Sequence, residues 1–221
     1  MKTKIVAILT LLLAFGCIGV RAQEQERPVA DKVLFIGDSM TGWLAERMGA
    51  YGNTNGFEVT TVVWDGSTIK KWGESPGLHS VIREQKPDVI FISLGMNELF
   101  EANPSRFQAS VDAIKGAAGD IPVVWVGPPS WPGHNKGQTL NNWLASQMGS
   151  GHYFNSFDLK LPRQSQSNPH PSREGMITWM DRIMQWLETD GAVALPGYQK
   201  PAGEQMSRGK TFIYKRMKES F

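Results

Sequence analysis

Short apolar segments alternate with amphipathic helical segments along most of this 221-residue chain. The apolar segments are rich in Val, Ile and Phe and have the length of buried strands. Strands that alternate with helices are joined by crossovers, which makes the sheet parallel and covers both of its faces. The sequence therefore predicts an α/β protein, a three-layer α/β/α sandwich around a five-stranded parallel sheet. The expected strands are Lys32–Gly37, Glu58–Trp64, Asp88–Leu94, Ile121–Val126 and Tyr153–Phe157.

Helical periodicity fills the gaps between these strands. It is clearest in the last helix, where the apolar residues from Met176 to Leu187 fall on one stripe and Pro171 suits a first turn. We expect one domain over residues 32–190, without internal repeats. The expected helices are Met40–Tyr51, Leu78–Gln85, residues 107–118, Leu140–Met148 and Pro171–Leu187.

The amino-terminal segment has the pattern of a signal peptide over residues 1–22. Positive residues open it, an apolar run too short for a comfortable membrane span follows, and Val20-Arg21-Ala22 offers a cleavage site. We therefore expect an exported protein, periplasmic or secreted, with no transmembrane span in the mature chain. Lipoprotein anchoring through Cys17 is the alternative, and Phe15 fits a lipobox poorly.

Two further segments flank the domain. Residues 23–31 are polar and are expected to form a linker. Residues 191–221 form a tail rich in Pro, Gly, Lys and Arg, which ends near Thr211-Phe212-Ile213-Tyr214. An added strand, a docking arm and partial disorder all remain open for this tail.

Charge and cysteine content exclude several classes of function. Removal of residues 1–22 takes away three basic residues and no acidic ones, so the formal net charge changes from +2 to −1. No basic stripe indicates nucleic-acid binding. The single cysteine, Cys17, leaves with the signal peptide, so the mature chain has no disulfide, thiol nucleophile or thiolate metal site. Asp38, Glu98 and the few histidines lack metal-ligand spacing, so no metal is expected.

Candidate chemical groups follow separate strands. Ser39 stands on the turn after the first strand, Gly66 follows the second, Asn97 follows the third, and His170 precedes the last helix. Because the carboxyl ends of parallel strands share one edge of a sheet, these groups suggest acyl transfer through a serine. Each residue also has a plain structural interpretation: a helix cap for Ser39 and His170, a turn for Gly66 and a loop for Asn97.

The four blocks together resemble those of the SGNH hydrolases, which include the GDSL esterases and lipases. The matching blocks are Gly37-Asp38-Ser39, Asp65-Gly66-Ser67, Gly95-Met96-Asn97-Glu98 and His170-Pro171. The resemblance implies a flavodoxin-like sheet, Ser39 as nucleophile and His170 as base, with no cofactor. It also implies an oxyanion hole formed by the N–H groups of Ser39 and Gly66 and the side-chain amide of Asn97.

One position departs from the family pattern. The final block normally reads Asp-x-x-His, but Ser167 occupies the place of the aspartate. A backbone carbonyl can orient His170 and leave a Ser-His dyad, which we favour because nucleophile and base remain. Alternatively, Glu174 or Asp158 supplies the acid, or the site is weakened and only binds.

The resemblance and the eight tryptophans lead us to expect a carboxylic ester hydrolase that acts on O-acetyl groups of carbohydrates. Trp131, in a proline-rich loop after the fourth strand, is a candidate for stacking on a sugar ring. An O-acyltransferase with the same site and a catalytically silent carbohydrate-binding protein remain alternatives. The expected partner is a small-molecule or glycan ester, and the oligomeric state is left open.

Overall fold

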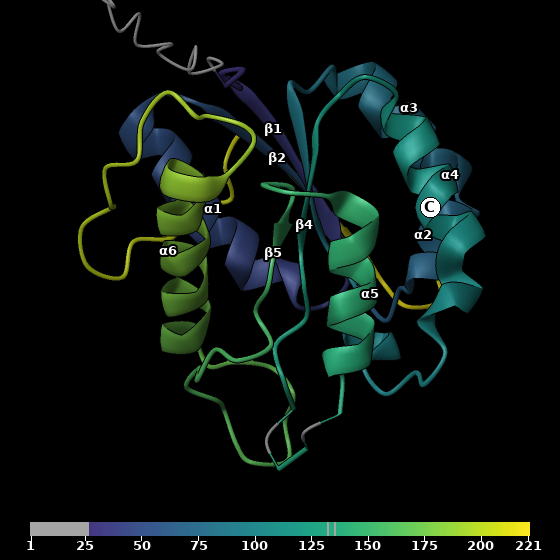
Figure 1. Cartoon of the computed structure of the whole chain (residues 1–221). Coiled ribbons are helices and arrows are strands. Elements are labelled where there is room, and N and C mark those ends of the chain that lie inside the picture. The colour runs from purple at the N-terminus through teal and green to yellow at the C-terminus, as the bar shows by residue number, and fades with distance from the viewer. Residues whose placement is uncertain (1–26, 132, 135) are drawn as a thin grey trace, which may run out of the picture.

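The computed structural model describes residues 27–131, 133–134 and 136–221, and the expected signal peptide with Cys17 lies outside these residues. The described chain forms one parallel sheet with helices on both faces (Figure 1). The strand order is β5-β4-β3-β1-β2-β6. The strands are β1 (Lys32–Gly37), β2 (Glu58–Trp64), β3 (Val89–Ser93), β4 (Val123–Val126), β5 (Tyr153–Phe154) and β6 (Thr211–Lys215).

Each strand is apolar on both sides because both faces of the sheet are covered. In β1, Val33 and Phe35 pack into the core on one face, while Leu34 and Ile36 pack into the core on the other. This alternation follows from the period of two in a strand. It explains why the strands appear in the sequence as continuous apolar runs.

The helices divide into two groups, one on each face. Helices α1 (Thr41–Asn55) and α6 (Arg173–Asp190) pack against each other on one face. On the other face lie α2 (Ile69–Gly73), α3 (Pro76–Gln85), α4 (Gln108–Ala118) and α5 (Gln138–Met148). Two short 3₁₀ helices, η1 (Met96–Glu98) and η2 (Pro104–Phe107), follow β3. The three-layer α/β/α prediction is confirmed.

The start of α6 differs from the sequence-based expectation. Ser172 is the N-cap, and its side chain accepts a hydrogen bond from the N–H of Gly175 at 3.1 Å. Pro171 therefore lies before the helix rather than in its first turn. A serine cap satisfies an N–H that would otherwise lack a partner, which favours this boundary.

The sheet has six strands, so the expected number of five is wrong. The extra strand is β6, which pairs in parallel with β2 and places Tyr214 beside Val63. It lies in the C-terminal tail, for which a strand was one of the open alternatives. After β6 the chain ends on the sheet face that α2 covers. There the ring centroids of Phe221 and Trp72 are 5.0 Å apart.

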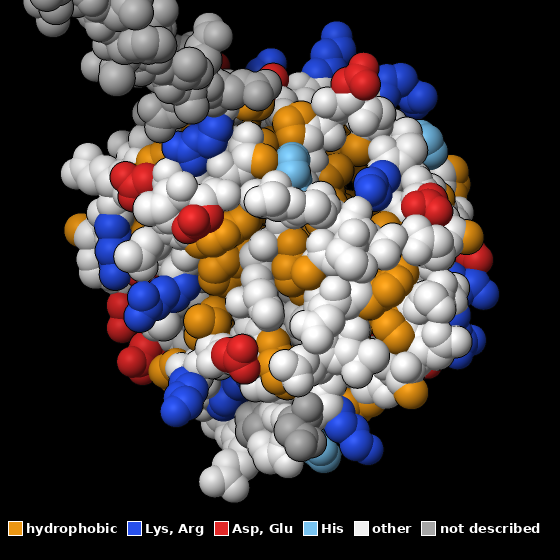
Figure 2. Space-filling model, in the orientation of Figure 1, with side chains coloured by type: hydrophobic (Ala, Val, Ile, Leu, Met, Phe, Trp, Pro, Cys, Tyr) orange, Lys and Arg blue, Asp and Glu red, His pale blue; other side chains and the backbone are white. Residues whose placement is uncertain are grey.

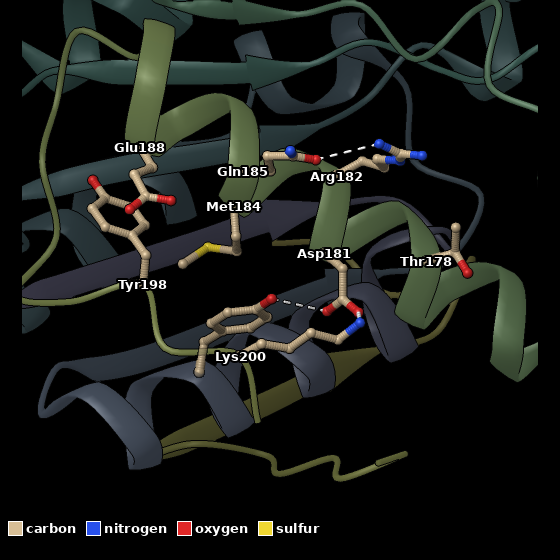
Figure 3. Close-up of a pocket in the computed structure, with 9 residues that line it drawn as sticks. Thr178, Asp181, Arg182, Met184, Gln185, Glu188, Tyr198 and Lys200 are labelled. Atoms are coloured by element: carbon tan, nitrogen blue, oxygen red, sulfur yellow. Dashed lines mark hydrogen bonds and ion pairs between the residues drawn. The ribbon is translucent and has the colours of Figure 1, made fainter. Parts of the chain in front are cut away.

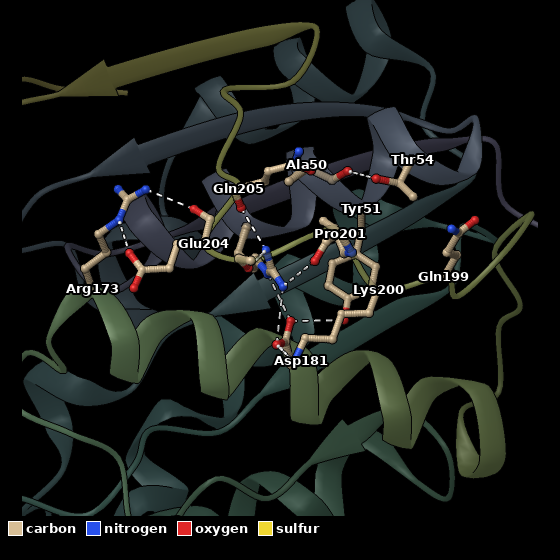
Figure 4. A network of polar contacts seen from close by, with 12 residues as sticks. Ala50, Tyr51, Thr54, Arg173, Asp181, Gln199, Lys200, Pro201, Glu204 and Gln205 are labelled. Carbon is tan, nitrogen blue, oxygen red and sulfur yellow. Dashed lines mark hydrogen bonds and ion pairs between the residues drawn. The ribbon is translucent and has the colours of Figure 1, made fainter.

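A buried charge network fastens the segment that leads to β6 (Figure 4). Arg47 on α1 is fully buried and contacts Asp181 on α6 at 2.9 Å. The same guanidinium donates to the carbonyl oxygens of Pro201, Gly203 and Gln205. Because all its hydrogen-bonding directions are used, this cation is stable inside the protein and ties the tail to both helices.

Asp181 is the centre of this network. Besides Arg47, it accepts hydrogen bonds from the Tyr51 hydroxyl at 3.0 Å and from Lys200 at 2.7 Å. Burial raises the pKa of this carboxyl, but its hydrogen bonds from Arg47 and Lys200 outweigh that effect, so the pKa lies below its ordinary value. The carboxylate stays charged and holds the tail over the α1–α6 contact.

The amino-terminal side of the domain is also packed. Val29 forms a parallel bridge with Ala194, Ala30 is buried, and Arg27 donates to the carbonyl of Leu187 at 2.8 Å. The described part of the expected linker therefore runs along the end of α6. None of the helices within the described residues combines the length and apolar character needed to cross a bilayer. On the face seen in Figure 2, acidic and basic side chains are interspersed.

Candidate active site

The carboxyl end of β1 sets the position of Ser39. Strand β1 lies between β2 and β3, and Ser39 follows it by two residues. A Cβ on Gly37 would lie 2.1 Å from the carbonyl oxygen of Ser93 at the end of β3 and 2.2 Å from Oγ1 of Thr41. Only glycine allows this close approach, which lets α1 begin next to the end of β3 and leaves Ser39 at the carboxyl edge of the sheet.

The structure brings Ser39 and His170 into contact. The Nε2 atom of His170 lies 2.8 Å from the Ser39 Oγ, although the residues are far apart in sequence. His170 is held by the segment between β5 and α6. This is the distance at which a base can accept the hydroxyl proton.

Asn168 orients the imidazole from its other side. The Oδ1 atom of Asn168 lies 2.9 Å from Nδ1 of His170 and also accepts the backbone N–H of His170 at 2.9 Å. An amide oxygen only accepts, so Nδ1 carries the hydrogen and Nε2 keeps its lone pair for Ser39. The network thus assigns the tautomer that a general base requires.

The expectation for this orienting group was wrong in detail. A backbone carbonyl was expected, with Glu174 or Asp158 as alternatives, and the described residues show neither arrangement. The exposed side chain of Ser167 contacts Ser165 instead. An Asx-type bond from Asn168 to the backbone of residue 170 explains the difference, since it points the amide at the ring two residues on.

Two side chains support the loop that carries His170. The Nδ2 atom of Asn168 donates to Gln164 Oε1 at 3.0 Å, which fixes the orientation of the amide. Arg163 donates to the carbonyl oxygens of Pro169 and Ser130. The guanidinium therefore ties the histidine loop to the loop that follows β4.

The electrostatic setting keeps His170 neutral. Burial lowers its pKa, Asp65 raises it, and Arg163 lowers it, and the net result lies below the ordinary value. A neutral imidazole is the form that can accept a proton from Ser39.

Gly66 and Asn97 follow the two strands that flank β1: Gly66 lies in the turn after β2, and Asn97 lies in η1 after β3. Within the described residues, the N–H groups of Ser39 and Gly66 donate no hydrogen bond, so both remain available to an oxyanion. Gly66 has a φ of 59°, a conformation that favours glycine. The Asn97 amide donates to the carbonyl of Ser67 at 2.7 Å, which uses one of its two N–H groups and links the turns after β2 and β3.

Two buried carboxyl groups stand next to these residues, and sequence reasoning gave them no role. Asp38 Oδ1 accepts from the N–H of Met40, and Glu98 Oε1 accepts from the N–H of Ile69. Their second oxygens, Asp38 Oδ2 and Glu98 Oε2, have no partner among the described residues. Burial raises the pKa of Asp38 to about 8, helped by the negative charges of Glu98 and Asp65, and burial raises that of Glu98 to about 7.

A cavity of about 220 Å³ opens beside the serine and the histidine. Trp131 is not among the described residues that line it; its ring instead lies 5.9 Å from that of Phe100. Trp43 lines this cavity although sequence reasoning did not single it out. Its position four residues after Ser39 in the sequence is the feature that could have indicated it. The lining residues are Ser39, Gly42, Trp43, Val63, Asp65, Gln164, His170, Pro171, Met176 and Tyr214.

A larger cavity of about 410 Å³ lies elsewhere, between α1, α6 and the start of the tail (Figure 3). Asp181, Tyr198 and Lys200 line it, and none of the predicted site residues does. Of the two cavities, the smaller one at the carboxyl edge of the sheet is the one that Ser39 and His170 line.

Comparison with known proteins places this geometry in context. No family model matches the sequence, and no curated protein matches it significantly. Solved structures do match. A carbohydrate esterase family 3 structure from Talaromyces cellulolyticus is 13% identical, over 71% of this chain and 98% of that one, with a TM-score of 0.50. A family 3 carbohydrate esterase from Clostridium thermocellum is 15% identical, over 70% and 93%, with a TM-score of 0.52.

A third structure, of a protein described as a GDSL-like lipase from Bacteroides ovatus, is 14% identical over 76% of this chain and 57% of that one, with a TM-score of 0.52. At such low identity these likenesses establish the fold. The chain has the α/β fold of the SGNH hydrolases, as its sequence blocks indicated.

Proposed function

We propose that this protein is an exported serine esterase that hydrolyses a carboxylic ester through an acyl-serine intermediate. One observation carries the proposal: the 2.8 Å contact between Ser39 Oγ and His170 Nε2, in a ring whose Nδ1–H is held by Asn168. A serine hydroxyl attacks poorly unless a neighbouring base takes its proton, and this geometry supplies that base.

Acylation follows from the positions of these atoms. Ser39 Oγ attacks the ester carbonyl carbon while its proton passes to His170 Nε2. The N–H groups of Ser39 and Gly66, and the second amide N–H of Asn97, stabilise the oxyanion. When the tetrahedral intermediate collapses, the bond to the alcohol oxygen breaks and His170 returns the proton to that oxygen.

Deacylation repeats the sequence with water. His170 Nε2 takes a proton from the water molecule, whose oxygen attacks the acyl carbon. Collapse of the second intermediate breaks the bond to Ser39 Oγ, which recovers its proton and releases the acid. Every step uses side chains and backbone groups of the described chain.

The substrate we propose is an O-acetyl ester of a carbohydrate. Two of the structures with this fold are described as carbohydrate esterases, and the cavity beside Ser39 and His170, of about 220 Å³, is open to a small ester. Export to the periplasm or the medium is supported by the signal-like residues 1–22, and such a destination fits a glycan substrate.

The experiment compares ester hydrolysis by the wild type, Ser39→Ala, His170→Ala and the control His134→Ala, with p-nitrophenyl acetate as substrate. We expect both site variants to lose at least about 10²-fold in kcat, and the control to keep the wild-type rate. Wild-type turnover that survives in Ser39→Ala would overturn the proposal. So would a folded wild type that releases no acetate from any ester.

A further inference from the structure

Exposed aromatic side chains gather at the mouth of the catalytic cavity. Trp43 is 39% exposed and Tyr214 is 54% exposed, and both line the cavity that contains Ser39 and His170. Most other large apolar side chains in the described part of the chain are buried. Exposed apolar surface concentrated at a cavity is typical of a ligand-binding site.

A third exposed apolar side chain lies beside the oxyanion donors. Met217 is 62% exposed, and its Cε atom would lie only 2.8 Å from a Cβ built on Gly66. The side chain therefore covers the turn after β2. Tyr214 and Met217 both come from the C-terminal tail, and through Tyr214 this tail forms part of the cavity wall.

The two aromatic side chains of the cavity, Trp43 and Tyr214, belong to regular secondary structure. Trp43 lies in the first turn of α1, directly after the nucleophile turn. Tyr214 lies on β6 beside Val63 of β2, and its hydroxyl donates to Asp65 Oδ2. The N–H of Asp65 in turn donates to the carbonyl of Lys215 at 2.9 Å. Groups fixed in this way lose little conformational freedom on binding.

The polar groups of the cavity suit hydroxyls rather than anions. Asp65 Oδ1 makes no hydrogen bond within the described residues, and the Nε2 of Gln164 is also free there. These two groups provide an acceptor and a donor. None of the described lining residues is a lysine or arginine, and Asp65 is the one carboxylate among them.

We propose that Trp43, Tyr214, Asp65 and Gln164 form a subsite for a neutral sugar ring that carries the ester, a subsite that discriminates against acidic sugars. The inference rests on the proposed esterase function and names its substrate class. The apolar C–H face of a sugar packs on the aromatic rings, and its hydroxyls bond to Asp65 and Gln164. A uronate carboxylate in the same place would face Asp65, and like charges in a partly buried site repel strongly.

The first test measures kcat/KM on an acetylated xylo-oligosaccharide and on ethyl acetate, which has no ring to bind. Trp43→Ala and Tyr214→Ala should lose roughly tenfold more on the oligosaccharide than on ethyl acetate, mainly through KM. Phe100→Ala, which removes an equally exposed aromatic ring outside the cavity, should match the wild type on both substrates. Equal losses on the two substrates, or no loss, overturn the aromatic subsite.

The second test addresses charge. The wild type should hydrolyse the acetylated xylo-oligosaccharide at least about tenfold better than an acetylated galacturonide of the same length. Asp65→Asn should narrow that difference by improving the relative rate on the galacturonide. An equal preference in the wild type, or a preference unchanged in Asp65→Asn, contradicts the selection by charge.

A binding measurement separates failure of the subsite from failure of the esterase. Ser39→Ala protein is titrated calorimetrically with acetylated xylo-oligosaccharide, and the Ser39→Ala/Trp43→Ala and Ser39→Ala/Tyr214→Ala variants follow. Weaker binding in both double variants supports the subsite even if no hydrolysis is ever found. Identical binding in all three proteins overturns the subsite. It leaves the esterase proposal untouched, because that proposal is tested by the separate hydrolysis assay.

Discussion

The side-chain oxygen of Asn168 accepts the Nδ1–H of His170 at 2.9 Å, on the opposite side of the ring from Ser39. Ser167 occupies the position of the usual aspartate, and the neutral amide of the next residue, Asn168, makes the contact with the ring instead. The amide fixes the tautomer and direction of the ring but adds no negative charge to stabilise the imidazolium. An aspartate would both orient the ring and supply a negative charge, whereas Asn168 only orients it.

Replacement of Asn168 tests its orienting role. Asn168→Ala should lower kcat roughly ten- to hundredfold with little change in KM, because the ring loses its fixed tautomer. The neighbouring Ser167→Ala serves as the control and should match the wild type, because the Ser167 side chain is exposed and, among the described residues, bonds only to Ser165. Steady-state kinetics on p-nitrophenyl acetate measures both, and an unchanged kcat in Asn168→Ala would show that the amide is dispensable.

The variant Asn168→Asp restores the charge. A carboxylate next to the ring stabilises the imidazolium, so the pKa of His170 rises and the acid limb of the kcat/KM profile moves to higher pH. The plateau kcat should be at least that of the wild type. A profile that does not move, in a variant that folds normally, contradicts the assignment of Nδ1 as the atom that faces residue 168.

The pH dependence of the wild type follows from the surroundings of His170. Burial and Arg163 lower its pKa and Asp65 raises it, so the acid limb of kcat/KM should lie below the ordinary histidine value of about 6.5. Removal of the negative charge in Asp65→Asn destabilises the imidazolium, and the limb should shift further down. A pH–rate series from about 4.5 to 8 measures this; an upward shift in Asp65→Asn would refute the sign.

Arg163 acts as a positioning residue through the backbone on either side of the cavity. Arg163→Met should lower kcat several-fold, because the carbonyls of Pro169 and Ser130 lose their shared donor and the histidine loop loosens. The loss of a nearby positive charge should also raise the pKa of His170, which moves the acid limb to higher pH. A merely structural role would not move that limb. Lys160→Met, on an exposed residue of the same loop, is the matched control.

Asp38 should make the stability of the fold depend on pH. Its pKa is raised to about 8 in the folded protein, so between its unfolded value near 4 and about 8 the folded state holds a proton that the unfolded state has released. Stability is then full at the acid end and falls as the pH rises through that window. Asp38→Asn removes this proton, so it should reduce the fall.

Urea unfolding at the two ends of that window provides the measurement. The wild type should lose on the order of 2–3 kcal/mol more than Asp38→Asn across it. Asp158→Asn, on an exposed carboxyl, should behave like the wild type. Parallel pH profiles for wild type and Asp38→Asn would mean that Asp38 is ionised in the folded protein at neutral pH.

Local pattern predicted most of the fold, and non-local contacts account for what it missed. The strand over residues 32–37 was readable because apolar residues must fill both faces of a buried parallel strand. Strand β6 was not, because its partner is β2 and residues 191–210 connect to it without a helix. Nothing local specifies which sheet edge such a segment joins.

The site shows the same division. Ser39 and His170 were predicted because a serine after a buried strand and a distant histidine have recognisable chemistry, and the structure brings the two side chains into contact. The contact of Asn168 with His170 was not predicted, because the family pattern places the orienting residue three residues before the histidine. Asn168 stands two residues before it and reaches the ring through an Asx turn. Trp131 was predicted because it stands in a proline-rich loop, and Trp43, which lines the cavity with Ser39, was not considered.

The central claim is that His170 makes the Ser39 oxygen nucleophilic. Treatment of the folded protein with a fluorophosphonate, followed by peptide mass spectrometry, tests it most directly. We predict one adduct per chain, located on Ser39, formed at a rate that falls at least about 10²-fold in His170→Ala. An adduct on another residue, or a Ser39 that reacts equally fast without the imidazole, would contradict the account.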